Sequence, residues 1–133
     1  MLPSQGRGRG FESRLSLYIL YIINMQEISA YDLRKNRDNY TILDIREQSE
    51  RLKDGTIPEN YHLSLSTITI DDIKKFLDNN KVKDIVIYCH TGKRSSMLIK
   101  TIIDNKIIDP RRIYNLEGGY VLWKLSGGEI NII

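Results

Sequence analysis

Apolar and polar residues alternate along the chain in a way that predicts short strands followed by helices. Residues 85–88, Ile-Val-Ile-Tyr, form a β-branched and aromatic run without polar alternation, which is typical of a strand buried on both faces of a parallel sheet. Gly92 then allows a sharp turn. Beyond it, apolar residues recur at helical spacing over 98–103, so a helix beginning near Arg94 or Ser95 is expected to face the sheet with one apolar stripe.

The same pattern continues on both sides of this unit. Ser29 followed by Asp32 resembles a capping box, which predicts a short helix ending near Lys35. Thr69 is a favourable N-cap for another helix, which is expected to end near residues 79–80. Further strands are expected at 40–43, 62–65 and 112–116, with a charged turn or short helix at 47–54 and a last helix at 120–125. The sequence therefore predicts an α/β fold, with a small parallel sheet of four to five strands and helices on both faces.

Residues 1–24 differ from the rest of the chain. Positions 4–14 are rich in Gly, Arg and Ser, a composition that does not support a packed core, and the apolar run 15–23 is far shorter than the ~20 residues needed to cross a bilayer. We therefore expect an N-terminal extension over 1–24, either disordered or not part of the native protein, ahead of one domain over 25–133. Residues 10–14, GFESR, resemble a translated transfer-RNA gene, which favours Met25 as the start. A signal or anchoring segment and a genuine extra element are the alternatives.

Composition narrows the class of protein. The chain has 133 residues, enough for one domain, and a formal net charge of +3, to which the arginines of the N-terminal extension contribute. No basic stripe is interleaved with aromatic residues, so no nucleic-acid surface is expected, and membrane association is not expected either. The single cysteine excludes an internal disulfide and a cysteine-based metal cluster, and it fits a reducing compartment. We expect a cytoplasmic protein, or an exported one if residues 15–23 belong to a signal.

The single cysteine, Cys89, lies where the buried strand ends and the loop begins. The first N–H groups of the following helix lack intrahelical partners, and the loop around Gly92 can turn them toward the sulfur. The helix dipole and the charges of Lys93 and Arg94 add positive potential. Such surroundings lower a thiol pKa from about 8.5 into a range of roughly 3.5 to 7.5. The alternative is that Cys89 is only a small buried hydrophobic residue.

CHTGKR, residues 89–94, is the first of three stretches that resemble motifs of the rhodanese family. It is similar to the six-residue active-site loop of that family, in which a strand-end cysteine leads into a helix. LDIREQSE, residues 43–50, followed by GTIPEN, residues 55–60, resembles its D-x-R-E…G-H-I-P segment, and LEGGYVLW, residues 116–123, resembles its C-terminal L-x-G-G-x-x-x-W segment. The stretches occur in the family's order and are spread over most of residues 25–125. The chain departs from the pattern at two positions, with Thr56 where the family usually has His and Glu59 where it usually has Gly.

The resemblance implies a single-domain thiosulfate sulfurtransferase. The Cys89 thiolate would take the outer sulfur of thiosulfate or a similar small anionic donor, and the resulting persulfide would pass it to cyanide, a thiol or a protein acceptor. The loop residues expected to bind substrate are His90, Thr91, Gly92, Lys93, Arg94 and Ser95. Asp44 and Arg46 lie at the carboxyl end of a strand and are expected to support the site as an ion pair. No metal and no organic cofactor are expected.

Two other functions remain open at this point. A phosphatase or arsenate reductase could use a cysteine in a similar loop, but the phosphatase pattern C-x-x-x-x-x-R requires an arginine at the sixth position after the cysteine. Here that position is Ser95, and the arginine comes one residue earlier, at Arg94. A shorter loop suits a terminal sulfur better than a phosphoryl group with three equatorial oxygens. The second alternative is a persulfide carrier or interaction module in a sulfur relay.

Overall fold

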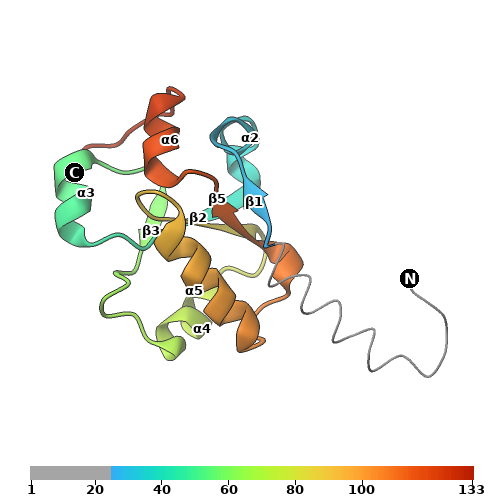
Figure 1. The fold of residues 1–133 in the computed structure, drawn as a ribbon. Coiled ribbons are helices and arrows are strands. Elements are labelled where there is room, and N and C mark those ends of the chain that lie inside the picture. The colour runs from blue at the N-terminus through green and yellow to red at the C-terminus, as the bar shows by residue number, and fades with distance from the viewer. Residues whose placement is uncertain (1–24) are drawn as a thin grey trace, which may run out of the picture.

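The computed structural model describes residues 25–133, so the expected N-terminal extension lies outside the described residues. Five parallel strands form one sheet in the order β1-β5-β4-β2-β3, and the predicted α/β class is confirmed (Figure 1). The strands are β1 (Glu27–Ile28), β2 (Tyr40–Asp44), β3 (Asn60–His62), β4 (Asp84–Tyr88) and β5 (Ile113–Leu116). The strand that precedes Cys89 therefore lies at the centre of the sheet.

Helices cover both faces of this sheet (Figure 1). They are α2 (Ala30–Lys35), α3 (Gln48–Asp54), α4 (Ile70–Asp78), α5 (Lys93–Asp104) and α6 (Gly119–Leu125), with short 3₁₀ turns at Arg37–Asn39 and Pro110–Arg112. Ile85 and Ile87 of β4 pack on the face that α4 and α5 cover. Val86 and Tyr88 pack on the opposite face with α2 and α6. The unbroken apolar run in β4 follows from this burial on both faces.

Side-chain caps begin two of the helices where the sequence predicts them. Ser29 Oγ accepts a hydrogen bond from the Asp32 N–H at 3.0 Å, and α2 ends at Lys35 as expected. At the start of α4, Thr69 Oγ1 accepts from the Asp72 N–H at 3.1 Å, and the Asp72 carboxylate accepts from the Thr69 N–H at 3.0 Å. This reciprocal pair satisfies two backbone donors that the helix itself cannot.

The strand expected at 62–65 is wrong in its bounds, because β3 covers Asn60–His62. The backbone of the following residues still bonds to the end of β2, with Leu63 N–H donating to Asp44 O and Leu65 N–H donating to Ile45 O, both at 3.1 Å. Leu63 and Leu65 also pack against the core. Their apolar alternation therefore reflects burial beside the sheet, although neither residue belongs to a strand. β1 is a further strand that the apolar pattern does not predict, since two residues are too short to show a period.

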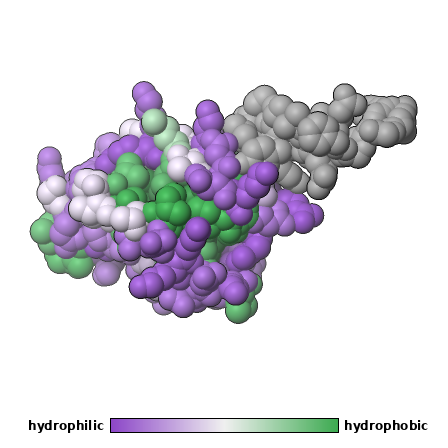
Figure 2. Space-filling model, turned by 90° about the horizontal axis from the view of Figure 1, so that it is seen from below, coloured by the Kyte–Doolittle hydropathy of each residue, from purple (hydrophilic) through white to green (hydrophobic). Residues whose placement is uncertain are grey.

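Apolar side chains remain partly exposed beside the core on the side of α4 and α5. Figure 2, seen from below Figure 1, shows hydrophobic atoms between polar ones on this face. The partly buried hydrophobic residues that pack against the core here are Met25, Leu63, Leu65, Ile68, Ile107 and Ile108. Within residues 25–133, none of the helices has the length and apolar character that crossing a membrane would require.

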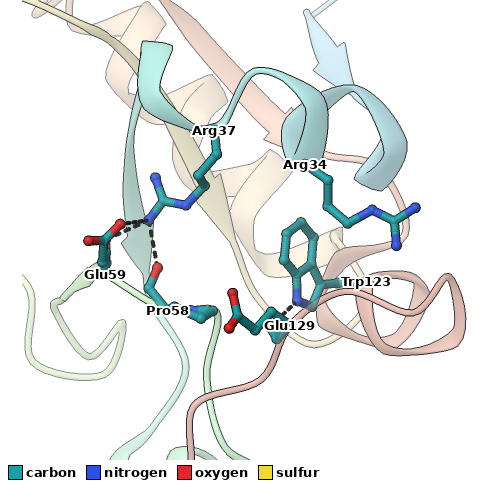
Figure 3. Close-up of a pocket in the computed structure, with 6 residues that line it drawn as sticks. All are labelled: Arg34, Arg37, Pro58, Glu59, Trp123 and Glu129. Carbon is teal, nitrogen blue, oxygen red and sulfur yellow. Dashed lines mark hydrogen bonds and ion pairs between the residues drawn. The ribbon is translucent and has the colours of Figure 1, made fainter.

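Glu59 occupies a backbone conformation that favours glycine. Its φ is +56°, and Arg37 Nη2 holds the segment by donating to Pro58 O at 2.5 Å and to Glu59 O at 2.8 Å (Figure 3). Arg37, Pro58 and Glu59 line a cavity of about 270 Å³ together with Arg34, Trp123 and Glu129. The glycine that the rhodanese family usually has at this position would suit the local backbone, because residues with a Cβ atom are about 1–2 kcal/mol less stable in the left-handed region.

Glu59→Gly is therefore expected to stabilise the protein. Relief of the left-handed strain exceeds the extra chain entropy that glycine loses on folding, for a net gain of about 0.5–1 kcal/mol. The lost contact between Arg37 and the Glu59 carboxylate is 3.9 Å long and that side chain is 82% exposed, so it contributes little. Urea unfolding should show a higher midpoint. The control Lys74→Gly, within helix α4, should lower the free energy of unfolding by about 1 kcal/mol, and an unchanged or lower midpoint for Glu59→Gly would contradict the strain argument.

Candidate active site

Cys89 directly follows the central strand β4, and its sulfur is enclosed by hydrogen-bond donors. The residue is only 1% exposed. Its Sγ accepts from the Gly92 N–H at 3.1 Å and from the Ser95 N–H at 3.4 Å, and the Ser95 hydroxyl lies within 3.4 Å. Gly92, with φ +97°, is the N-cap of α5, which begins at Lys93, one residue before the expected start. The loop between β4 and α5 therefore forms the cradle that the sequence predicts.

These contacts decide the protonation of the thiol. Burial raises the pKa of the Cys89 thiol, because it disfavours the charged form. The hydrogen bonds from the Ser95 hydroxyl and from the N–H groups of Ser95, Gly92 and Thr91 act in the opposite direction and prevail, so the pKa lies below its ordinary value. A lowered pKa gives Cys89 more of the nucleophilic thiolate at neutral pH than a free cysteine has.

Asn115 of β5, which the sequence pattern does not predict as a site residue, supports the loop. It is 2% exposed, and its Nδ2 donates to Gly92 O at 3.1 Å and to Glu27 Oε2 at 3.2 Å. Its Oδ1 lies 2.5 Å from Ser95 Oγ. The Ser95 hydroxyl has one proton, so Asn115 Oδ1, Gly92 O at 3.2 Å and the Cys89 sulfur are alternative acceptors for it. The only sequence signal for Asn115 was a polar residue within an otherwise apolar strand.

The start of α6 holds the other side of the loop. The Tyr120 N–H donates to Cys89 O at 2.9 Å, and the Val121 N–H donates to His90 O at 3.0 Å. Gly119 makes this approach feasible, because a Cβ at its position would lie 2.6 Å from His90 O, and its φ is +59°. The glycine of the C-terminal motif therefore allows the backbone at the start of α6 to pack directly against the backbone of the cysteine loop.

Arg94 is bound to a carboxylate that the sequence analysis did not select. Its Nη1 and Nη2 donate to Glu50 Oε1 and Oε2, both at 2.8 Å. The hydrogen bond from Arg94 lowers the pKa of Glu50 to about 2, and the bond to Glu50 together with attraction to Glu50 and Cys89 raises the pKa of Arg94. Among the other predicted binding residues, His90, Thr91 and Lys93 have exposed side chains at the rim. In Figure 1 this loop lies between α3, which carries Glu50, and α6.

Asp44 and Arg46 form a fully buried ion pair behind the site. Arg46 Nη2 donates to Asp44 Oδ2 at 2.9 Å and to Gly55 O at 2.7 Å, and neither charged side chain is exposed. The Tyr88 hydroxyl donates to Asp44 Oδ2 at 2.8 Å, and the guanidinium lies 4.2 Å from the centre of the Tyr120 ring. Arg46 Nη1 has no hydrogen-bond acceptor among residues 25–133. The pair ties the carboxyl end of β2 to the loop that follows α3.

Comparison with known proteins identifies the family of this chain. The model of the rhodanese-like domain matches residues 29–126, which is most of the chain and includes every element from α2 to α6. The chain belongs to the rhodanese-like family.

Relatives of this rhodanese-like chain include a sulfurtransferase and proteins of solved structure. A sulfurtransferase from Allochromatium vinosum is 29% identical over 90 residues, covering 68% of this chain and 77% of the relative. A rhodanese-related protein from Thermoplasma volcanium is 27% identical with a TM-score of 0.65, covering 79% of this chain and 96% of that one. A Rhodopseudomonas palustris protein described as a possible tyrosine phosphatase is 24% identical with a TM-score of 0.65, covering 98% and 99%, which shows the shared fold alone.

Thr56, one of the two departures from the family pattern, is held by backbone contacts in this rhodanese-like domain. Thr56 is 1% exposed, and its N–H donates to Asn131 O at 2.9 Å. The Asn131 N–H returns a bond to Thr56 O at 2.8 Å, so the two residues form an isolated antiparallel bridge. A backbone bridge from a segment near the C-terminus thus fixes the loop after α3, where the family usually has a His.

Ser95→Ala is expected to move the reactivity of Cys89 to higher pH. The hydroxyl and backbone donors lower the thiol pKa, so removing one donor raises it and leaves less thiolate at pH 7. Hydrogen bonds to charged groups contribute about 1.5–3 kcal/mol, so alkylation at pH 7 should slow about tenfold. Arg94→Ala should raise the pKa less, since Glu50 neutralises that guanidinium. Alkylation rates against pH measure both effects.

The matched control for this prediction is Ser96→Ala. The Ser96 hydroxyl donates to Lys93 O at 2.8 Å on the outer side of α5, and its removal should leave the pH midpoint unchanged. A Ser95→Ala midpoint equal to that of the unmodified protein would show that the backbone N–H groups alone set the thiol pKa.

Proposed function

We propose that this protein is a sulfurtransferase that carries sulfur as a Cys89 persulfide. The observation that supports this most directly is the enclosure of the Cys89 sulfur by two N–H groups, that of Gly92 in the six-residue loop and that of Ser95 directly after it. Those donors stabilise a negative sulfur before and after transfer, as fixed dipoles do for other developing anions. The relative from Allochromatium vinosum is a sulfurtransferase, which supports the same class of reaction.

Transfer proceeds in two displacement steps. The Cys89 thiolate attacks the outer sulfur of thiosulfate, a new S–S bond forms at Sγ, and the original S–S bond breaks with its electron pair leaving on sulfite. An acceptor such as cyanide then attacks the outer sulfur of the persulfide, the product leaves as thiocyanate, and the electron pair returns to the Cys89 thiolate. This is covalent catalysis with ping-pong kinetics. Lys93 and Arg94 lie at the rim where an anionic donor approaches.

The test is sulfur loading followed by intact mass measurement. Incubation with thiosulfate should add the mass of one sulfur atom to the protein, and cyanide should remove it with formation of thiocyanate. Prior alkylation of Cys89 should block the gain in mass. A protein that stays unloaded with thiosulfate and with hydropersulfide donors would contradict the proposal.

A parallel assay separates sulfur from phosphate chemistry. The loop has Ser95 at the sixth position after Cys89, and that hydroxyl faces the sulfur within 3.4 Å, so the loop is shorter than one that wraps a phosphoryl group. Hydrolysis of an aryl phosphate should therefore be negligible beside transfer from thiosulfate in the same preparation. Faster turnover of the phosphate ester would overturn the assignment.

A further inference from the structure

Arg94, which attracts the Cys89 sulfur, is already paired with a carboxylate of the protein. Arg94 binds both oxygens of Glu50 at 2.8 Å, and the two side chains are only 36% and 29% exposed. Bidentate arginine–carboxylate pairs that are partly buried are among the stronger polar contacts in proteins. A donor that needs the Arg94 charge must therefore compete with a carboxylate that the protein itself supplies.

Glu50 does not depend on Arg94 for its position. Its Oε1 also accepts the Glu47 N–H at 3.0 Å, as part of the capping box that begins α3. The carboxylate is thus held in place by its own helix before Arg94 approaches. With a pKa of about 2, Glu50 remains charged throughout the neutral range. Protonation of Glu50 therefore does not release Arg94 for an incoming anion.

We propose that Glu50 is a positioning residue that sets the choice of sulfur donor, because its ion pair with Arg94 disfavours dianionic donors and favours weakly charged hydropersulfides. This inference rests on the proposed sulfurtransferase function and goes beyond it by naming the class of donor. Attack of the thiolate on thiosulfate gathers three negative charges at the sulfur cradle. Attack on a neutral hydropersulfide places only one negative charge there, so this reaction needs less positive charge from Arg94.

The hydropersulfide reaction balances without a further reactant. The Cys89 thiolate attacks the outer sulfur of R–S–SH, a bond forms between Sγ and that sulfur, and the S–S bond of the donor breaks. The electron pair leaves on the thiolate RS⁻, and the proton stays on the new Cys89 persulfide. The products are one thiolate and one protein persulfide.

The experiment compares two donors on Glu50→Gln. Glutamine keeps the length of the side chain and an oxygen for the Glu47 N–H, but it removes the charge that holds Arg94. Single-turnover loading should become about tenfold faster with thiosulfate and change less than twofold with the hydropersulfide of N-acetylcysteine methyl ester, an otherwise uncharged donor. The pH midpoint of Cys89 alkylation should fall as well, because Arg94 then acts on the sulfur unopposed.

Two controls separate this role from a structural one. Glu47→Gln removes a neighbouring carboxylate that bonds to Ser66 and to the Glu50 backbone N–H, but not to Arg94. Glutamine keeps an oxygen for these donors, so the donor ratio should stay unchanged. In an Arg94→Met background, Glu50→Gln should increase the preference for thiosulfate much less, because no Arg94 charge is released and only the repulsion by the carboxylate is lost. If Glu50→Gln is poorly folded, Glu50→Ala must show the same donor shift.

The outcomes are distinguishable. Equal slowing of both donors by Glu50→Gln would mean that Glu50 only supports the fold, and the inference would be overturned. If the unmodified protein takes sulfur from neither donor, the proposed function fails. In that case the alkylation midpoint still tests the Glu50–Arg94 coupling, since a midpoint that does not fall in Glu50→Gln overturns it.

Discussion

Cys89→Ser is expected to abolish sulfur transfer while the fold remains intact. The chain has one cysteine, so no other thiol can form the persulfide. A serine hydroxyl keeps the size of the side chain and can accept the same N–H groups of Gly92 and Ser95, but it does not ionise at neutral pH and cannot store sulfur. We expect the rate of thiocyanate formation to fall to the background level, a loss of roughly a thousandfold or more.

Intact mass after thiosulfate treatment, together with a thermal melt, checks this prediction. Cys89→Ser should show no added sulfur and a melting temperature close to that of the unmodified protein. Ser96→Ala, which alters a hydroxyl outside the cradle, should load normally. Transfer by Cys89→Ser at a rate near that of the unmodified protein would exclude Cys89 as the carrier.

Arg46→Met is expected to lower the free energy of unfolding by about 3–5 kcal/mol. The side chains of Asp44 and Arg46 are both fully buried, and removal of the cation leaves a carboxylate without its main partner in a place that water does not reach. Methionine fills much of the same volume and can pack against Tyr120, so the loss reports the uncompensated charge more than a cavity. Urea unfolding followed by fluorescence of Trp123 measures the change.

Arg51→Met provides the matched control. Arg51 also donates to Asp44 Oδ2, at 3.3 Å, but its side chain is 13% exposed and it makes further bonds to Gln48 and Asn60. Its loss should cost about 1.5–3 kcal/mol, in the range of a hydrogen bond to a charged group and less than the loss of Arg46. The double variant Asp44→Asn with Arg46→Met should recover part of the stability, because the buried charge is then gone. Equal losses for Arg46→Met and Arg51→Met would show that burial does not decide the effect.

Elements with a local signal were predicted from the sequence. The continuous apolar run of β4, the helical stripe of α5 and the caps at Ser29 and Thr69 each depend on residues within one element. β1 carries no such signal, because two residues become a strand only by pairing with β5, far away in the chain. The same reason explains β3, whose bounds depend on where its ladder with β2 stops.

The site also contains residues that the sequence predicts and residues that it does not. Cys89 and the loop up to Ser95 are contiguous, so the spacing of these residues was enough to predict a cradle around the sulfur. Asn115 and Glu50 reach the loop only through the fold, from 20 residues after Ser95 and from 44 residues before Arg94. The sequence therefore identified Arg94 as a positive charge near the sulfur, but not the carboxylate that neutralises it.

The contacts between α6 and the loop also have a consequence for the newly made protein. Tyr120 and Val121 bind the carbonyls of Cys89 and His90, and they are translated about 30 residues later. At roughly 5–20 residues per second, Cys89 spends a few seconds on the ribosome before the segment that fixes its loop exists. During that interval its thiol has no fixed cradle and behaves as an ordinary cysteine. A nascent chain that ends before Gly119 should therefore react with sulfur donors no faster than an ordinary cysteine does.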